Sequence, residues 1–124
     1  MKKFSEIEYV RPDMEVEKEK IGAYTEALKN VKSYEELRGL FMEEKEREDV
    51  WATMAEVAQV RYTVDTRDSF YEGEVQFWNE TVPAIRLLMQ KAEKVILESP
   101  FIKEFAGEFG DFFVKNMEVG QKLA

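Results

Sequence analysis

The residues best suited to chemistry gather at one junction, between two segments that both have the spacing of amphipathic helices. The stretch Val60–Glu72 (VRYTVDTRDSFYE) holds two arginines, two aspartates and three aromatic side chains. Arg61 and Asp65 are four residues apart, the spacing of an ion pair on one face of a helix. The helix that follows can be capped by Thr66, Asp68 or Ser69. The stretch is therefore either a well-capped corner between helices or a polar network that contacts something outside them.

The chain lacks the two side chains that most often carry catalysis and bind zinc. It contains no histidine and no cysteine. Without imidazole there is no usual general base, no Ser-His or Cys-His pair and no His-containing zinc site. Catalysis would have to rest on carboxylates, lysine, tyrosine or serine. We therefore expect this chain by itself to be inactive and to have no cofactor of its own.

Carboxylates are plentiful, since the chain has 26 aspartates and glutamates, but they form no recognised motif. A di-iron bundle needs Glu-x-x-His on two helices. An EF-hand loop needs alternating Asp or Asn followed by glycine, which Asp65–Asp68 does not supply. A metal site made of carboxylates alone stays open, and elemental analysis of purified protein would test it.

Seven consecutive charged residues, Glu43–Asp49, interrupt the apolar stripe of the second expected helix. The pattern favours a solvated stretch of helix supported by pairs such as Glu43 with Arg47. The alternative is contact with something polar outside this domain.

Composition and charge exclude several classes of protein. A content of 44% apolar and 35% charged residues in 124 residues is typical of one soluble globular domain. The formal charge of -8 argues against nucleic acid, because a phosphate-backbone binder needs a basic face. Every apolar run is broken by charge well before the roughly 20 residues of a membrane span. Together with the missing cysteines and the lack of an export signal, this predicts a cytoplasmic protein.

Periodicity predicts an all-α chain of about four antiparallel helices in an up-down bundle. The first helix follows Arg11-Pro12. The second begins at the capping box Ser33–Glu36 and the third at the capping box Ser69–Glu72. We expect the third helix to be kinked near Pro83, because proline removes one backbone donor while the apolar phase continues on both sides.

The last helix is expected to begin at Ser99-Pro100, with serine as N-cap and proline in the first turn. Its phenylalanines are expected to share one face and to belong to the core. They are Phe101, Phe105, Phe109, Phe112 and Phe113. Trp51 and Trp78 are expected to pack between the second and third helices.

An ordered set of short segments resembles the N-terminal helical region of oligoendopeptidase F-like proteins, zinc-dependent peptidases related to thimet oligopeptidase. The set covers nearly the whole chain. It consists of Tyr9–Asp13, Met54-Ala55, Val60–Tyr71, Glu74, Phe77, Pro83 and Leu97–Phe101.

The resemblance implies that residues 1–124 are a single helical domain, the N-terminal part of a longer peptidase that hydrolyses short peptides. In the family, an HEXXH helix and a downstream glutamate hold the zinc, and this chain has neither. The N-terminal helices would form a wall of the substrate channel and an interdomain surface. The resulting candidates for interdomain or substrate-channel contacts are Arg61, Tyr62, Asp65, Thr66, Asp68 and Tyr71.

The partners implied are the remainder of the parent peptidase and, in the full-length protein, short peptides. A detached domain would also expose apolar surface, so we expect self-association through the last helix or the Trp78 side of the third. The alternative function is a free-standing acidic helical module that binds protein and has no link to proteolysis. Reading the gene past residue 124 separates the two.

Overall fold

The computed structural model describes residues 6–123, which form five α-helices and no strand. The all-α prediction is confirmed. In chain order the helices are α1 (Met14–Lys29), α2 (Tyr34–Val64), α3 (Ser69–Leu97), α4 (Ile102–Phe109) and α5 (Asp111–Leu123).

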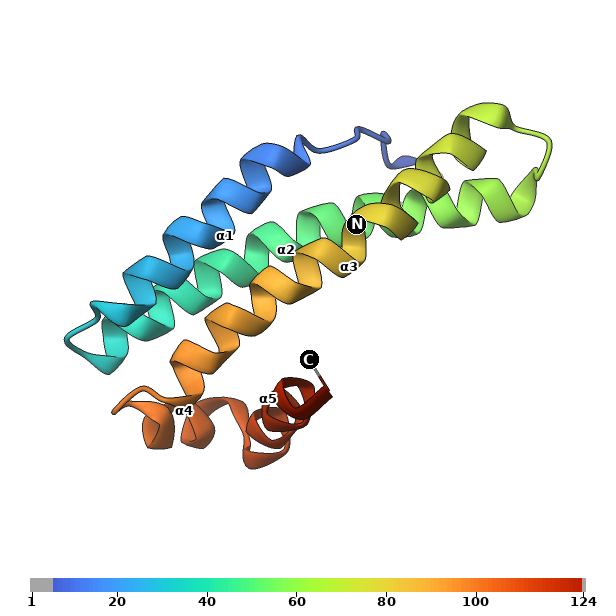
Figure 1. The fold of residues 1–124 in the computed structure, drawn as a ribbon. Coiled ribbons are helices and arrows are strands. Elements are labelled where there is room, and N and C mark those ends of the chain that lie inside the picture. The colour runs from blue at the N-terminus through green and yellow to red at the C-terminus, as the bar shows by residue number, and fades with distance from the viewer. Residues whose placement is uncertain (1–5, 124) are drawn as a thin grey trace.

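The three long helices, α1, α2 and α3, lie side by side and alternate in direction (Figure 1). α3 packs against both α1 and α2. The far ends of α2 and α3 extend past the start of α1 and are joined by the junction loop, which is yellow-green in Figure 1. The junction is therefore one tip of the molecule, and the other ends of these helices lie near α4 and α5.

Short polar side chains start the three long helices by accepting hydrogen bonds from free backbone N–H groups. The Asp13 carboxylate accepts from Val16 N at 3.3 Å, and the Ser33 hydroxyl accepts from Glu36 N at 3.1 Å, which confirms one half of the predicted capping box. In the other half, the Glu36 carboxylate accepts from Lys32 N at 3.4 Å instead of Ser33 N. The cap of α3 is Asp68 rather than Ser69, which is already the first helical residue. The predicted capping box thus lies one residue too late.

Two apolar clusters fill the space between the helices. One lies toward the α4 and α5 end and is centred on Tyr24, Leu28, Leu37, Ile96 and Phe105. The other lies toward the junction and includes Met14, Ile21, Ala58, Trp78 and Ile85.

The predicted packing of Trp51 and Trp78 between α2 and α3 is confirmed, because their rings stack with their centroids 6.2 Å apart. Val50 and Phe70, which share the apolar spacing, are instead exposed.

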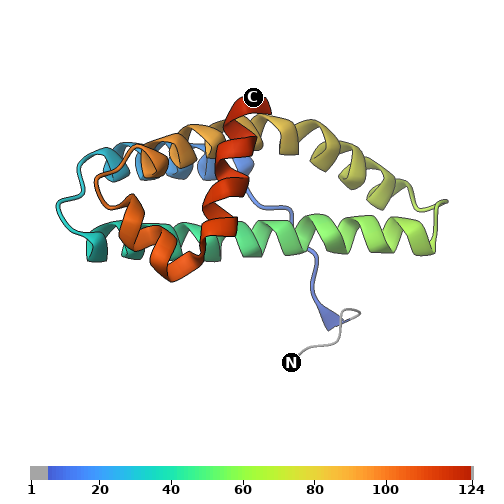
Figure 2. The same cartoon turned by 90° about the horizontal axis from the view of Figure 1, so that it is seen from below.

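The expected fourth helix is two short helices, so the simple up-down bundle is wrong at this end. Gly110 ends α4 with φ +99° and ψ 147°, a conformation that is nearly confined to glycine. α5 then runs across the long helices instead of alongside them (Figure 2). The break also removes Phe112 from the phenylalanine face and leaves it 78% exposed, whereas Phe105 is fully buried.

Two further expectations concern prolines. α4 begins at Ile102, two residues after Pro100, and the Ser99 hydroxyl accepts from Phe101 N at 3.1 Å instead of capping the helix. α3 continues through Pro83 as a single helix. A kink at Pro83 stays a prediction.

Candidate functional site

The predicted junction residues include one internal network, centred on Arg61. Its guanidinium donates to the Tyr71 hydroxyl at 2.9 Å and to the Ile7 carbonyl oxygen, and it lies 5.7 Å from the centre of the Tyr71 ring. The predicted ion pair between Arg61 and Asp65 is wrong. Asp65 pairs instead with Arg67, with 3.2 Å between Nε and Oδ1. Arg61 therefore fastens the N-terminal segment to the corner between α2 and α3.

The other predicted residues divide by whether the fold uses their polar groups. Asp68 is used, because its carboxylate accepts from Phe70 N at 2.9 Å and from Tyr71 N at 3.2 Å. Asp65 and Thr66 are exposed, and Tyr62 is half-buried. The corner thus has an internally bonded side and an exposed side.

A second polar cluster, missed as a site by sequence reasoning, lies on the same half of the molecule. Glu74 is only 6% exposed, yet its carboxylate is fully paired. It accepts from the Tyr9 hydroxyl at 2.5 Å and from Arg11 Nε at 2.9 Å, and its second oxygen pairs with the other Arg11 nitrogen. Trp78 Nε1 donates to the Tyr9 oxygen at 3.1 Å, and the Arg11 guanidinium lies 4.0 Å over the Phe77 ring.

These donors determine how the cluster ionises. The hydrogen bonds from Arg11 lower the pKa of the Glu74 carboxyl, and that effect outweighs the burial that would raise it. Burial and the bond to Glu74 raise the pKa of Tyr9 to about 12. Both groups keep their ordinary charge at neutral pH, so the cluster is a stable clamp between the N-terminal segment and α3.

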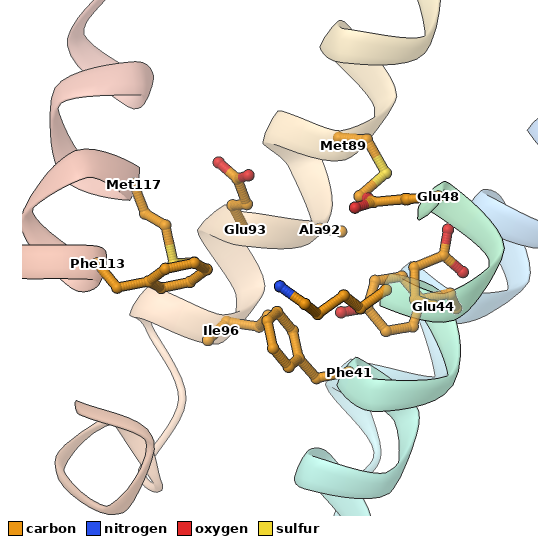
Figure 3. Close-up of a pocket in the computed structure, with 11 residues that line it drawn as sticks. Phe41, Glu44, Glu48, Met89, Ala92, Glu93, Ile96, Phe113 and Met117 are labelled. Atoms are coloured by element: carbon orange, nitrogen blue, oxygen red, sulfur yellow. The ribbon is translucent and has the colours of Figure 1, made fainter. Parts of the chain in front are cut away.

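The largest departure from expectation is a cavity of about 150 Å³ where α2, α3 and α5 meet over Tyr24 of α1. One part of its lining is polar: Tyr24, Glu44, Lys45, Glu48 and Glu93. The rest is apolar: Phe41, Met89, Ala92, Ile96, Phe113 and Met117. Figure 3 shows Glu48 directed from α2 toward α3, with Phe113 and Met117 of α5 on the opposite side.

The cavity overturns part of the prediction for the charged run. The pair between Glu43 and Arg47 is confirmed at 3.9 Å. Glu44, however, is only 2% exposed and pairs with Arg47, and Glu48 is half-buried, so the run is not uniformly solvated. The structure gives Glu48 and Glu93 no hydrogen bond or ion pair among residues 6–123.

Burial raises carboxyl pKa values around the cavity, and for Glu44 it outweighs the opposing hydrogen bond from Arg47. Burial is the main cause for Glu44, Glu48 and Glu93, and nearby carboxylates add to it for Glu44 and Glu48. The pKa of Glu48 reaches about 7. The pKa of the Tyr24 hydroxyl is raised as well, by burial and then by the charges of Glu44 and Glu48.

The spacing of the glutamates was the available signal for both clusters. Glu74 lies four residues from Phe70 and from Trp78, and Glu44 and Glu48 continue the stripe from Leu37 to Trp51. Glutamate is almost never buried unless its carboxylate is paired, so a glutamate at an apolar position of a helix indicates a bonding partner. What the spacing cannot tell is whether a donor from elsewhere reaches it.

Neither cluster fits a zinc ion. The chain has no histidine or cysteine. Within the described residues, no three or more Asp or Glu side chains are grouped so that they could hold a metal. Likewise, none of the helices between residues 6 and 123 is long and apolar enough to span a bilayer.

Comparison with known proteins identifies the family to which this domain belongs. The family model described as the Peptidase M3 N-terminal domain matches residues 4–124. The chain belongs to this family. No curated protein matches it.

Solved structures of peptidases contain the same fold as this Peptidase M3 N-terminal domain. PZ peptidase A with an inhibitor is 28% identical, with a TM-score of 0.92 over 97% of this chain. A protein assigned as oligoendopeptidase F is 27% identical, with a TM-score of 0.93 over 98%. A second protein assigned as oligoendopeptidase F, from Bacillus anthracis str. Ames, is 30% identical, with a TM-score of 0.91 over 95% of this chain. The chain spans only 21% to 22% of the length of these proteins.

Proposed function

We propose that residues 1–124 are one helical domain, the N-terminal part of a longer oligoendopeptidase F-like zinc peptidase that hydrolyses short peptides. The observation that carries this proposal is the asymmetry of the structural match. Nearly the whole chain superimposes on peptidases of which it spans about a fifth. The missing cysteines favour a cytoplasmic location for the parent protein.

In this proposal the chain contributes shape and contacts, and other parts of the parent protein contribute the zinc and the catalytic residues. The residues present here do not fit the ion, since both usual nitrogen and sulfur ligands are missing. We assign the domain to one wall of the substrate channel and to an interdomain surface.

The junction supports a division of roles among the six candidate residues. Arg61, Asp68 and Tyr71 use their polar groups within the chain, so they position the corner. Asp65 and Thr66 are exposed and can contact the remainder or a peptide, although the Asp65 carboxylate also pairs with Arg67. Tyr62 has no hydrogen bond partner among residues 6–123 and can make such a contact as well.

α5 offers a second contact surface. Phe112, Val119 and Leu123 are 78%, 50% and 82% exposed. The expectation that the Trp78 side of α3 is also exposed is wrong, since Trp78 is 3% exposed. We propose that the remainder of the peptidase covers α5. In its absence, sedimentation should show concentration-dependent self-association that Leu123→Ser reduces; monomers at all concentrations would contradict this use of α5.

The decisive experiment compares this chain with the product of the intact gene on a quenched short peptide, with and without a chelator. We expect the intact product to cleave the peptide and to lose activity with chelator, and the 124-residue chain to be inactive. Cleavage by the chain itself would overturn the proposal. So would a gene product that has no further domain, which would favour a free-standing module that binds protein.

Paired substitutions in the intact product test the channel-wall role. Asp65→Ala combined with Thr66→Ala should lower kcat/KM roughly threefold to tenfold, the effect of losing one or two hydrogen bonds. The control pair, Lys32→Ala with Glu35→Ala, is also exposed but lies at the opposite end of α2. Equal effects from both pairs would contradict a specific role for the junction.

A further inference from the structure

We propose that the cavity between α2, α3 and α5 binds a monocation on a short apolar stem, either an alkylammonium ion or a lysine side chain. The inference stands on the geometry of the cavity and does not depend on the proposed peptidase function. It assigns a ligand to a site that is separate from the junction.

The charges around the cavity do not balance. Among the residues that line the cavity, Glu44, Glu48 and Glu93 carry three negative charges when ionised and Lys45 carries one positive charge; Arg47, which does not line the cavity, pairs with Glu44 and offsets its charge. One negative charge is in excess. A single cation would neutralise it, and the partly buried setting would strengthen the attraction relative to bulk water.

The cavity also has hydrogen-bond acceptors without donors. Glu48 and Glu93 have no partner among the described residues. Tyr24 is 5% exposed and lines the cavity, and its hydroxyl also has no hydrogen bond there. The Tyr24 hydroxyl lies on a different helix than the glutamates, and its side chain lines the cavity, so it can accept a hydrogen bond from a ligand. An ammonium group has three N–H donors, which matches two carboxylates and one phenol oxygen.

The apolar part of the lining fits the stem of such a ligand. Phe41 and Phe113 present rings, and Met89 and Met117 present flexible thioethers that adapt to an inserted chain. A dry cavity of similar volume accommodates a benzene molecule, so about 150 Å³ is enough for a side-chain-sized group. A phenylalanine face also attracts a cation placed over it.

Other occupants fit less well. A divalent metal needs several oxygen ligands at short distance, and the described residues offer no such group. An anion would be repelled by the excess negative charge. A purely apolar ligand would leave Tyr24 and the two glutamates without donors.

The protein should be titrated with n-butylammonium chloride while NMR records the chemical shifts of the methyl groups of Met89, Ala92 and Met117. Met54, in the junction-side cluster, is the internal reference. We expect saturable shifts at the three cavity methyls, with an affinity on the order of millimolar for so small a ligand, and no shift at Met54. The neutral probe n-butanol should bind at least about fivefold more weakly, since it lacks the charge.

Substitutions link the binding to the unpaired carboxylates. Glu48→Gln and Glu93→Gln should each weaken n-butylammonium binding roughly fivefold to tenfold. Both remove an unpaired half-buried charge and keep the shape, so the fold is retained. Glu46→Gln is the matched control, because Glu46 is exposed on the same helix and does not line the cavity.

The pH dependence of n-butylammonium binding provides an independent readout. Affinity should increase as the pH rises through about 7, because a cation binds the ionised form of Glu48. The charged or titratable groups that act on Glu48 are Glu44, Lys45 and Asp49 on α2 and Glu93 on α3. α1 adds Tyr24 and, through Glu44, Glu17, while α5 lines the cavity with Phe113 and Met117, which do not titrate.

A third probe identifies the source of the cation. If Nα-acetyl-lysine methylamide binds more tightly than n-butylammonium, the site receives a lysine side chain from a polypeptide. The reverse order indicates a free amine, and either order supports the proposal. It is overturned if n-butylammonium gives no saturable shift, if n-butanol binds equally well, or if only Ca²⁺ or Mn²⁺ shifts the methyls. Unchanged affinity in both glutamine variants would also overturn it.

Discussion

Glu74 and Glu48 are both glutamates at apolar positions of long helices, yet their surroundings shift their acidity in opposite directions. Around Glu74, Tyr9 and Arg11 supply donors, and the pKa of the carboxyl is lowered. Around Glu48, burial and further carboxylates outweigh the charge of Lys45, no residue among 6–123 donates a hydrogen bond to it, and the pKa rises to about 7. Burial alone does not decide the charge of a carboxyl; the donors that reach it do.

The difference also separates two uses of a buried carboxylate. The clamp at Glu74 is complete within the chain and ties the N-terminal segment to α3. The cavity at Glu48 is incomplete, because no donor among residues 6–123 forms a hydrogen bond with Glu48, Glu93 or the Tyr24 hydroxyl. The first stabilises the fold, and the second is suited to receive a ligand.

The largest effect is expected from removing the paired carboxylate. Glu74→Ala should lower the free energy of unfolding by about 3 kcal/mol, because it leaves Arg11 and Tyr9 without their acceptor. Arg11 is 46% exposed at its side chain, which keeps the loss at the lower end for a buried pair. Urea unfolding measures it. Glu80→Ala, exposed on the same helix, should change stability by less than about 0.5 kcal/mol, and equal losses would show that the clamp is not stabilising.

The second largest effect is expected from a backbone change at Gly110, which should affect the cavity region and not the region around Glu74. Gly110→Ala should cost about 2 kcal/mol, because its φ of +99° and ψ of 147° are strained for any other residue. Since α5 carries Phe113 and Met117, amide exchange should speed up there and not around Glu74. Gly107→Ala is the control: Gly107 lies inside α4 with open space around it, so this change should stabilise by about 0.5 kcal/mol. A destabilising Gly107→Ala would contradict this explanation.

A smaller effect, of opposite sign to that of Glu74→Ala, is expected at the cavity. The folded pKa of Glu48 lies above its ordinary value of 4.5, so the folded state holds the proton more tightly. Its contribution to stability is fully present below pH 4.5 and is lost as the pH rises through about 7. Glu48→Gln should therefore stabilise by about 1 kcal/mol at pH 8, after allowance for solvent screening, and have little effect at pH 4. Thermal unfolding at both pH values measures this, and destabilisation at pH 8 would mean that Glu48 has a donor.

Sequence reasoning predicted the parts of the fold that depend on local spacing. The three long helices, the Ser33 cap and the tryptophan pair follow from periodicity and short-range hydrogen bonding. The division of the last helix did not, although two glycines, Gly107 and Gly110, lie in that segment and glycine weakens a helix. Gly107 stays helical and Gly110 does not, and nothing in their immediate neighbours distinguishes the two.

The site residues show the same limit. Arg61 was expected to bond to Asp65, its neighbour in the helix, but it reaches the Ile7 carbonyl and Tyr71 instead. Glu74 obtains its donors from Tyr9 and Arg11, more than 60 residues earlier in the chain. Helical spacing reports which side chains share a face, and only the tertiary fold determines which distant donors meet them.

The most direct test of the contrast between the two regions is an NMR titration of the glutamate side-chain carboxyl carbons in the intact 124-residue chain. The structure predicts that Glu74 titrates below 4.5 and that Glu48 titrates near 7 in the same sample. Similar midpoints for both, near the ordinary value for glutamate, would contradict the division into a completed clamp and a cavity that awaits a cation.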